Sequence, residues 1–448
     1  MLTVYSVQSV DMTRKKTVTL ITLGCSKNLV DSEKLMYRFN RLGYQVLHDA
    51  EPPKGSIVII NTCGFIGDAK EESIQTILSF SEARKSGYLQ KLYVMGCLSE
   101  RYTEELRDEI PEVDHYYGKF NYNEILDDLG EIWRSDYGPE RLLTTPSHYA
   151  YLKISEGCSR TCSYCAIPII TGKHRSVPME QLLEEVRYLV GQGVHEFQMI
   201  AQDLSYYGRD LYGEMRLAQL TEAIAQIPGV EWLRLHYTYP YEFPMDVLSV
   251  MRRYDNVCAY LDMALQHISD PMLIKMRRKI NKADTLRLLS SIREAVPGIH
   301  LRTTLMVGHP GETEADFEEL MEFTRMARFE RMGAFTYSEE EGTYAARTYT
   351  DDVPDDVKKD RLDRLMLLQQ DISEEINTAK VGSTLRVIID REEEDYFVGR
   401  TEYDSPEVDP EVFVEKNALL KPGHFYAVEI TAAGPYDLFG RLASKDTI

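Results

Sequence analysis

The sequence predicts an α/β protein made of three folded parts in series. Between residues 17 and 134, β-rich apolar runs alternate with amphipathic helical stretches, which indicates a doubly wound parallel sheet. Six more strand and helix pairs between residues 150 and 337 predict an incomplete (βα)6 barrel. Short strands in residues 378–448 predict a small antiparallel β-barrel. A chain of 448 residues has room for about three domains of typical size.

The first part begins at Thr17. Residues 1–16 have no periodic pattern, and we expect them to be a frayed leader or to precede a start at Met12. Strands are predicted at residues 18–24, 44–49, 56–62 and 91–96, and helices at 32–42 and 71–84. Residues 135–149 contain Gly138, Pro139 and Pro146, which interrupt the pattern and predict a linker.

The second and third parts follow the same reasoning. The six strands of the predicted barrel are residues 150–157, 196–203, 232–238, 259–265, 300–308 and 332–338. An acidic tract and a connecting helix, from Val357 to about Ala379, fill residues 338–377. The terminal barrel is expected to use strands at residues 384–390, 395–401, 411–416, 425–433 and 438–443.

Composition restricts the partners and the compartment. The chain has 51 basic and 72 acidic residues and a net charge of −21, so it repels nucleic acid unless its basic residues cluster. The excess of acidic residues is also explained by a need for solubility alone. No apolar run reaches the roughly 18 residues of a membrane span, and Met1 to Lys16 has no signal-peptide core. Seven irregularly spaced cysteines fit thiolate ligands in a reducing compartment better than disulfides. We therefore expect a cytoplasmic protein without a membrane partner.

The densest cysteine group is Cys158, Cys162 and Cys165, with C-x3-C-x2-C spacing. Three thiolates in so tight a loop suit a cubic iron-sulfur cluster, which needs four ligands, so one iron stays open to chelate a substrate. A zinc knuckle or a redox pair are the alternatives. Zinc sites usually add a second Cys or His pair downstream, and none follows here.

Three other cysteines each follow a predicted strand of the first part. Cys25 comes after the first strand, Cys63 after the third and Cys97 after the fourth, each beside a glycine. The carboxyl ends of parallel strands share one edge, so these thiols are expected to converge on a second three-thiolate cluster. The alternative is three buried cysteines acting as small hydrophobic residues. Cys258, in an apolar run, is interpreted as a core residue.

This order of cysteines resembles the methylthiotransferases, a family of radical S-adenosylmethionine enzymes. The resemblance implies two 4Fe-4S clusters, an auxiliary one on the first trio and a radical-generating one on Cys158, Cys162 and Cys165. It also implies S-adenosylmethionine as cofactor, cleaved to a 5′-deoxyadenosyl radical, with a second molecule supplying the methyl group of an inserted CH3-S. A low-potential donor such as flavodoxin would supply the electron.

Further residues match the family's cofactor contacts. Tyr164, before the last cysteine, fits the family pattern, and Gly308 to Glu312 resembles its glycine-containing contact to S-adenosylmethionine, although Phe is more common where His309 stands. Polar residues at or within other strands are expected to line the same cavity or to cap helices. The predicted cofactor contacts are Tyr164, Gln202, Arg302, Gly308 and Glu312.

The terminal segment resembles the TRAM domain, a module that the family associates with RNA binding. From Thr378 onward, however, eight basic residues stand against fourteen acidic ones. An acidic surface binds phosphate poorly and attracts basic proteins.

Two substrates compete within the family. One group modifies an adenosine of transfer RNA, and another modifies the β-carbon of an aspartate in a basic ribosomal protein, the twelfth of the small subunit. Stretches such as residues 201–204, 236–240, 337–343 and 405–409 resemble the second group, which we favour. The partner is then that ribosomal protein, with the ribosome as a further candidate. A hypothesis of another class is a nucleic-acid-binding or scaffold protein with structural clusters.

Overall fold

The computed structural model describes residues 16–134 and 139–443 of the chain. Residues 1–15, which include the expected leader, and residues 135–138 of the expected linker lie outside the described residues. The chain divides into two compact units, residues 1–144 and 145–448, and each is described by itself. No helix in the described part is long and apolar enough to cross a membrane.

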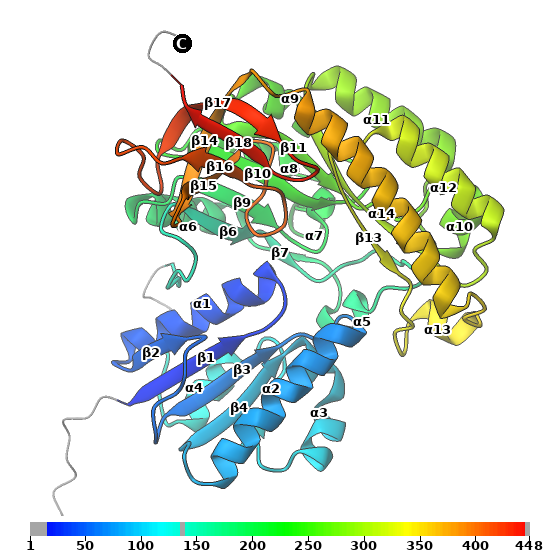
Figure 1. Cartoon of the computed structure of the whole chain (residues 1–448). Helices are drawn as coiled ribbons and strands as arrows, with labels where there is room; N and C mark the ends of the chain where they lie inside the picture. Colours follow the sequence, from blue (N-terminus) through cyan, green and yellow to red (C-terminus); the bar gives the residue numbers. More distant parts are fainter. Residues whose placement is uncertain (1–15, 135–138, 444–448) are drawn as a thin grey trace, which may run out of the picture. The chain divides into compact units, whose positions relative to one another are not determined.

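The first unit is a doubly wound α/β domain, as predicted (Figure 1). Its five strands pair in parallel in the order β2-β1-β3-β4-β5. The elements are β1 Thr17–Thr22, α1 Ser26–Arg41, β2 Gln45–His48, β3 Ile57–Thr62, α2 Gly67–Lys85, β4 Lys91–Gly96, α3 Cys97–Glu109, β5 His115–Tyr116 and α4 Tyr122–Asp128. The fifth strand was not predicted, because two residues are too short to show a pattern.

Each face of this sheet has its own apolar core. Ile57 and Ile59 of β3 face a core with residues of α1 and α4, and Val58 and Ile60 face another with residues of α2 and α3. Alternation along a strand that is buried on both sides produces this arrangement. The two layers hold the strand ends, and hence the cysteines that follow them, in place.

Helix α1 starts at Ser26, directly after Cys25 and six residues before the predicted start at residue 32. Its first three residues are polar, so apolar periodicity alone could not detect them. Helix α3 starts at Cys97 itself and was not among the predicted helices. Both helices therefore begin beside a cysteine, and the partial positive charge of a helix N-terminus favours a nearby thiolate.

The second unit contains the predicted incomplete barrel. Six parallel strands lie in the order β13-β12-β11-β10-β9-β6, without closure between the two outer strands. The strands are β6 Tyr149–Lys153, β9 Glu196–Ile200, β10 Trp232–Thr238, β11 Val257–Met263, β12 His300–Val307 and β13 Arg331–Thr336. The main helices are α6 Met179–Gly191, α8 Leu217–Ala225, α9 Asp246–Arg253, α11 Lys282–Ala295 and α12 Glu314–Ala327. Short elements are β7 Ser155–Glu156, α5 Ile167–Thr171, β8 Arg175–Ser176, η1 Leu204–Tyr206, α7 Arg209–Tyr212, α10 Asp270–Lys275 and α13 Tyr344–Thr348.

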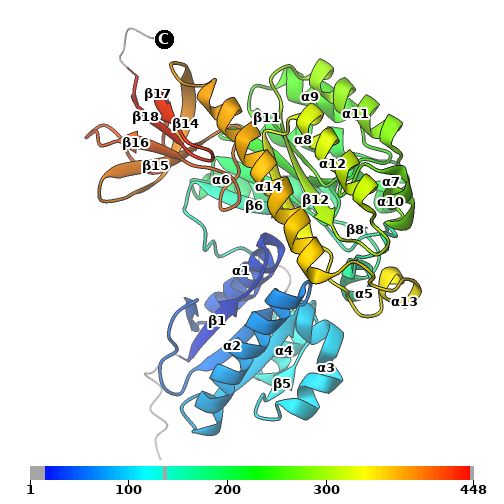
Figure 2. The ribbon, with the colours of Figure 1, turned by 45° about the vertical axis from the view of Figure 1, so that its right-hand side comes forward.

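A long helix leads from this sheet to the terminal barrel. Helix α14, Asp355–Thr378, packs along β13 and α12 (orange in Figure 2). The closed barrel has the order β14-β15-β16-β18-β17, with β14 Thr384–Glu392, β15 Tyr396–Thr401, β16 Val412–Glu415, β17 Phe425–Ala433 and β18 Leu438–Leu442. Four pairings are antiparallel, as predicted, but β16 and β18 are parallel. A closed ring of five strands cannot alternate direction throughout, so one parallel pair is required.

Buried ion pairs join the terminal barrel to the amino-terminal halves of the sheet strands. Arg400 forms a bidentate pair with Glu196, at 2.7 and 2.8 Å, and also binds Asp390. Asp404 pairs with Arg331, where burial alone would raise the pKa of the carboxyl but the guanidinium holds it down at about 2. Several acids that contributed to the expected acidic surface are therefore internal and neutralised.

We expect Arg400→Ala to destabilise the second unit by about 3 kcal/mol, because it removes one of the two guanidinium groups that bind the buried Glu196 carboxylate, the other being that of Arg234, and also removes the arginine partner of Asp390. Trp232 reports on this interface, since it is 1% exposed and its ring lies 4.7 Å from Phe425 of the barrel. Urea unfolding followed by its fluorescence in a Trp133→Phe background measures the change. The control Arg441→Ala removes a solvent-exposed pair with Glu429 and should leave the midpoint unchanged. Equal midpoints for the two variants would contradict the expectation.

Candidate functional site

The loop of Cys158, Cys162 and Cys165 lies at the carboxyl end of the six-stranded sheet, after β6 and β7. The short pair of β7 with β8 and a hydrogen bond from Cys158 N to Gly172 O, 3.1 Å, hold its first residues. Gly157 has φ +75°, and a Cβ there would lie 2.3 Å from the Lys173 carbonyl oxygen. Only glycine permits this close approach, so the residue before Cys158 has to be glycine.

Buried polar groups surround these thiols. Burial raises the pKa of the Cys158 thiol to about 12 and that of Cys165 further still, and a bound metal cation would favour the thiolate form of both. The Arg160 backbone N–H donates to Cys158 Sγ at 3.4 Å, and Arg278 Nη1 donates to Cys162 Sγ at 3.4 Å. These contacts suit sulfurs that carry negative charge.

The surroundings also show that an anionic group fits here. Arg278 is 2% exposed, and in the described part of the chain no carboxylate pairs with it. A buried, uncompensated guanidinium is costly. A cluster held by three thiolates would supply the missing negative charge. No three Cys, His, Asp or Glu side chains of the described residues are arranged to hold a single metal ion, so this argument rests on charge and on the thiols.

Gln202, one of the predicted cofactor contacts, and two other polar residues follow strands of the same sheet. Gln202 donates to Glu156, 2.5 Å, and its Oε1 is buried without a partner in the described chain. Gln266, with φ +74°, also has a buried Oε1 without a hydrogen-bond partner among the described residues. Asp203 binds Arg160 at 2.7 Å instead of pointing to solvent. Two unpartnered amide oxygens at strand ends are suited to a polar ligand.

The segment from Gly308 to Glu312 is held by its own contacts. Glu312 accepts from Gly308 N at 2.6 Å and binds His267 and Arg361, so its carboxylate is fully buried and occupied. Cofactor contact by Glu312 therefore stays a prediction, with a structural role beside it. Gly308 has φ +74°, which favours glycine.

His309 takes the place of an aromatic ring. Burial lowers the pKa of His309 to about 4, so the imidazole is neutral at pH 7. It makes edge contacts with Tyr164, Tyr337 and Tyr349, and its Nε2 lies 3.2 Å from Ser163 Oγ. A ring at this position explains why Phe is an acceptable counterpart.

Arg302 lies away from the cysteine loop in the register of its strand. It is the third residue of β12 and binds Asp409 of the terminal barrel at 3.2 Å and Asp262 at 3.6 Å. Contact between Arg302 and a cofactor stays a prediction, and the two ion pairs would compete with it for the guanidinium.

The second cysteine trio follows β1, β3 and β4 in the first unit, as predicted. A Cβ on Gly24 would lie 2.8 Å from Cys63 Sγ, and a Cβ on Gly64 would lie 2.9 Å from the Cys97 carbonyl carbon. The three strand ends therefore meet at one edge. Burial is the main cause that raises the pKa of Cys97 to about 12, and the nearby Lys119 ammonium opposes it.

Asn28 braces this edge. Its Nδ2 donates to Leu23 O and Thr62 O, at 3.0 and 3.1 Å, and its Oδ1 lies 3.7 Å from Cys97 Sγ. One side chain therefore connects the backbone near Cys25 and Cys63 with the sulfur of Cys97.

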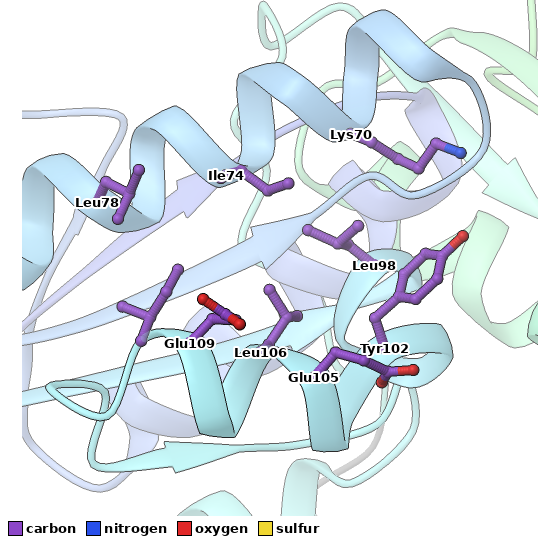
Figure 3. A pocket seen from close by; sticks show the side chains of 9 residues that line it. Lys70, Ile74, Leu78, Leu98, Tyr102, Glu105, Leu106 and Glu109 are labelled. Carbon is purple, nitrogen blue, oxygen red and sulfur yellow. The ribbon is translucent and has the colours of Figure 1, made fainter.

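An apolar cavity of about 460 Å³ lies elsewhere in this unit, between α2 and α3 (Figure 3). Ile74 and Leu78 line one side and Leu98 and Leu106 the other. None of the three cysteines lines it. The cavity is therefore separate from the cysteines, which lie at the strand ends.

Two residues beside the thiols were missed by sequence reasoning. Tyr239 directly follows β10, so the strand-end rule that selected Gln202 would also have selected it. Arg278 follows the short helix α10 and belongs to no motif, so no signal in the sequence indicated it.

Three family models match separate segments of the chain. Residues 152–324 match the Radical SAM superfamily, residues 17–118 match Uncharacterized protein family UPF0004, and residues 381–443 match the TRAM domain.

The chain is similar over nearly its full length to proteins called ribosomal protein uS12 methylthiotransferase RimO. The protein from Bacteroides thetaiotaomicron is 62% identical over 433 residues, 96% of this chain and 99% of its own length. That from Porphyromonas gingivalis is 62% identical over 431 residues, with the same coverage. That from Flavobacterium johnsoniae is 50% identical over 432 residues, 96% of this chain and 99% of its own.

Solved structures share the fold. The radical S-adenosylmethionine methyltransferase TsrM from Kitasatospora setae, with cobalamin and a [4Fe-4S] cluster bound, aligns with a TM-score of 0.55 at 14% identity. The alignment covers 74% of this chain and 77% of TsrM. The cobalamin-dependent S-adenosylmethionine radical enzyme OxsB aligns with a TM-score of 0.50 at 13% identity, covering 80% of this chain and 56% of its own.

We expect Cys→Ala at any position of either trio to remove about half of the iron from anaerobically reconstituted protein, since a cluster that loses one of three thiolates is not retained. Iron analysis should give about eight atoms per chain for the unaltered protein and about four for each variant. Cys258→Ala is the control, because Cys258 is buried in an apolar cluster with Trp232 and Tyr260. A variant of either trio that keeps all its iron would show that its cysteine is not a ligand.

Proposed function

Because the chain belongs to the RimO family of radical S-adenosylmethionine methylthiotransferases, we propose that it inserts CH3-S at the β-carbon of an aspartate in ribosomal protein uS12. Identity of about 62% over 96% of the chain carries this proposal. The reaction uses two molecules of S-adenosylmethionine, and a low-potential donor such as flavodoxin supplies the electron.

The residues divide between two cluster sites. Cys158, Cys162 and Cys165 hold the cluster that binds S-adenosylmethionine, and Cys25, Cys63 and Cys97 hold the auxiliary cluster. When bound, these clusters supply the one-electron reduction of S-adenosylmethionine and a site for sulfur, chemistry that no side-chain acid or base provides at an unactivated C–H bond.

The chain's own residues orient the cofactor and keep water away from it. Tyr164 directly precedes the last cysteine and makes an edge contact with the ring of His309, which is neutral at pH 7. The unpartnered amide oxygens of Gln202 and Gln266 are suited to the polar groups of S-adenosylmethionine. Exclusion of water protects a radical from side reactions.

The terminal barrel supports a protein substrate over transfer RNA. Tyr396, Phe413 and Phe439 form a partly exposed aromatic row, with ring centroids 5.9 and 5.5 Å apart. Such a row stacks on bases in RNA-binding barrels, but Glu415 stands opposite Tyr396 in the register. Carboxylates beside aromatic rings disfavour phosphate and favour the cationic side chains of a basic protein.

The hairpin between β14 and β15 adds two exposed acids to this surface, Glu394 and Asp395. Charge reversal of both, E394K with D395K, is expected to raise the KM for uS12 several-fold and to weaken its dependence on salt, because surface charges act on association. Steady-state kinetics at two ionic strengths measures the effect. The matched control D108K with E109K reverses two exposed acids at the carboxyl end of helix α3 in the first unit. Equal changes in both double variants would assign the effect to net charge alone.

The deciding experiment incubates the reconstituted, reduced enzyme anaerobically with S-adenosylmethionine and either uS12 or total transfer RNA. Mass spectrometry is expected to show replacement of one hydrogen by CH3-S on a uS12 aspartate and no change in adenosine. The same modification on adenosine would establish the transfer RNA alternative. Absence of S-adenosylmethionine cleavage would indicate that the clusters are structural.

The two trios are expected to fail differently in this assay. Cys162→Ala should abolish formation of 5′-deoxyadenosine, because no cluster remains to reduce S-adenosylmethionine. Cys97→Ala should retain part of that cleavage and lose the methylthio product. Chromatography of 5′-deoxyadenosine beside mass spectrometry of uS12 separates the outcomes, and retained cleavage in Cys162→Ala would contradict the assignment.

A further inference from the structure

Arg278 is a buried cation that reaches the thiol of Cys162. Its Nη1 donates to Cys162 Sγ at 3.4 Å and to Tyr164 Oη at 3.3 Å, and its Nη2 donates to the carbonyl oxygen of Ala264. Both terminal nitrogens therefore have hydrogen-bond acceptors, and these bonds fix the orientation of the guanidinium. Its Nε has no partner in the described chain.

The backbone around Arg278 is strained to place it. Arg277 has φ +57° and Lys279 has φ +59°, so non-glycine residues in the left-handed region stand on both sides. Strain of this kind persists where the surrounding structure requires a particular placement, and it clusters at functional sites. The Ser163 backbone N–H donates to Met276 O at 3.0 Å, which fastens this turn to the cysteine loop.

Tyr239 contacts both the guanidinium and the backbone of Arg278. Its ring lies 4.1 Å from Arg278 Cζ, and its hydroxyl donates to the Arg278 carbonyl oxygen at 2.9 Å. The hydroxyl oxygen is also 3.7 Å from Cys162 Sγ. Arg160 lies 4.3 Å from the same ring, but its charge is balanced by Asp203 at 2.7 Å. Arg278 is thus the cation beside the thiols whose charge is left for the cluster.

We propose that Arg278 raises the reduction potential of the cluster held by Cys158, Cys162 and Cys165, with Tyr239 as its positioning residue. The inference rests on the proposed function, which places that cluster on these three thiols. Reduction adds one electron to the cluster and no atom leaves, so the negative charge near Arg278 increases by one. A fixed cation that also donates a hydrogen bond to a ligand sulfur stabilises the reduced state more than the oxidised state, and burial strengthens the effect.

The test is an anaerobic redox titration of the full-length, iron-loaded protein against a low-potential reductant, followed by electron paramagnetic resonance. The relevant cluster is identified by the change in its signal when S-adenosylmethionine is added. Arg278→Gln removes the charge and keeps a hydrogen-bond donor. At a fixed solution potential, we expect the ratio of reduced to oxidised cluster to fall about tenfold, which corresponds to a midpoint about 59 mV lower for a one-electron couple.

Three further variants separate charge from structure. Arg277→Gln, the adjacent exposed arginine, should titrate like the unaltered protein. Arg278→Lys keeps the charge without the planar fork and should recover most of the potential. Tyr239→Phe removes the hydroxyl that holds the Arg278 backbone and should shift the midpoint in the same direction by less. A purely structural brace would alter iron content or stability and leave the midpoint of the loaded protein unchanged.

The inference and the proposed function fail in different ways. A fully loaded Arg278→Gln protein with an unaltered midpoint overturns the role of Arg278 while the S-adenosylmethionine-sensitive signal remains. If Arg278→Gln does not retain iron, an unaltered midpoint in fully loaded Tyr239→Phe overturns it. A protein with no signal that responds to S-adenosylmethionine overturns the proposed function itself.

Discussion

In a parallel sheet the carboxyl ends of all strands lie at the same edge, and both thiol sites of this chain depend on that constraint. In the first unit, cysteines up to 72 residues apart in sequence, Cys25 and Cys97, follow strands β1 and β4 of one sheet. In the second unit, the cysteine loop follows β6 and β7, and Tyr239 follows β10 of the same sheet. Residues that are remote along the chain become neighbours without any long irregular loop, because the helices between strands return the chain each time.

Buried charge is used in two opposite ways in the second unit. At the amino-terminal end of the sheet, Arg400 with Glu196 and Arg331 with Asp404 form closed pairs that fasten the terminal barrel. At the other end, Arg278 has hydrogen bonds and a ring to stack on but no carboxylate in the described chain. The complete ion pairs attach the terminal barrel to the sheet, whereas an arginine without a carboxylate partner is suited to a bound anion.

This distribution also changes the meaning of the acidic terminal domain. The count of acidic residues predicts a poor phosphate-binding surface, but two of these acids are not available to a partner. Asp404 is paired with Arg331 of the sheet, and Asp390 is paired with Arg400 within the barrel. The acids available to a partner are those on the outer face and hairpins, such as Glu394, Asp395 and Glu415. A sum over the sequence cannot separate the two groups, because ion pairing between distant segments is a property of the folded chain.

The sequence by itself determined the fold class, the six cysteines and their grouping, since strand and helix periodicities and cysteine spacing are local properties of the chain. It also identified the family, with the glycine-containing segment at Gly308. Four features escaped it: the start of α1 at Ser26, helix α3, the two-residue strand β5 and the parallel pair of β16 with β18. A polar first turn, a very short strand and the closure of a barrel leave no periodic signal. Only the tertiary structure decided that Arg278 reaches Cys162 and that Arg302 is paired with Asp409, because these contacts join residues 116 and 107 positions apart. Periodicity along the chain carries no information about which distant side chains meet.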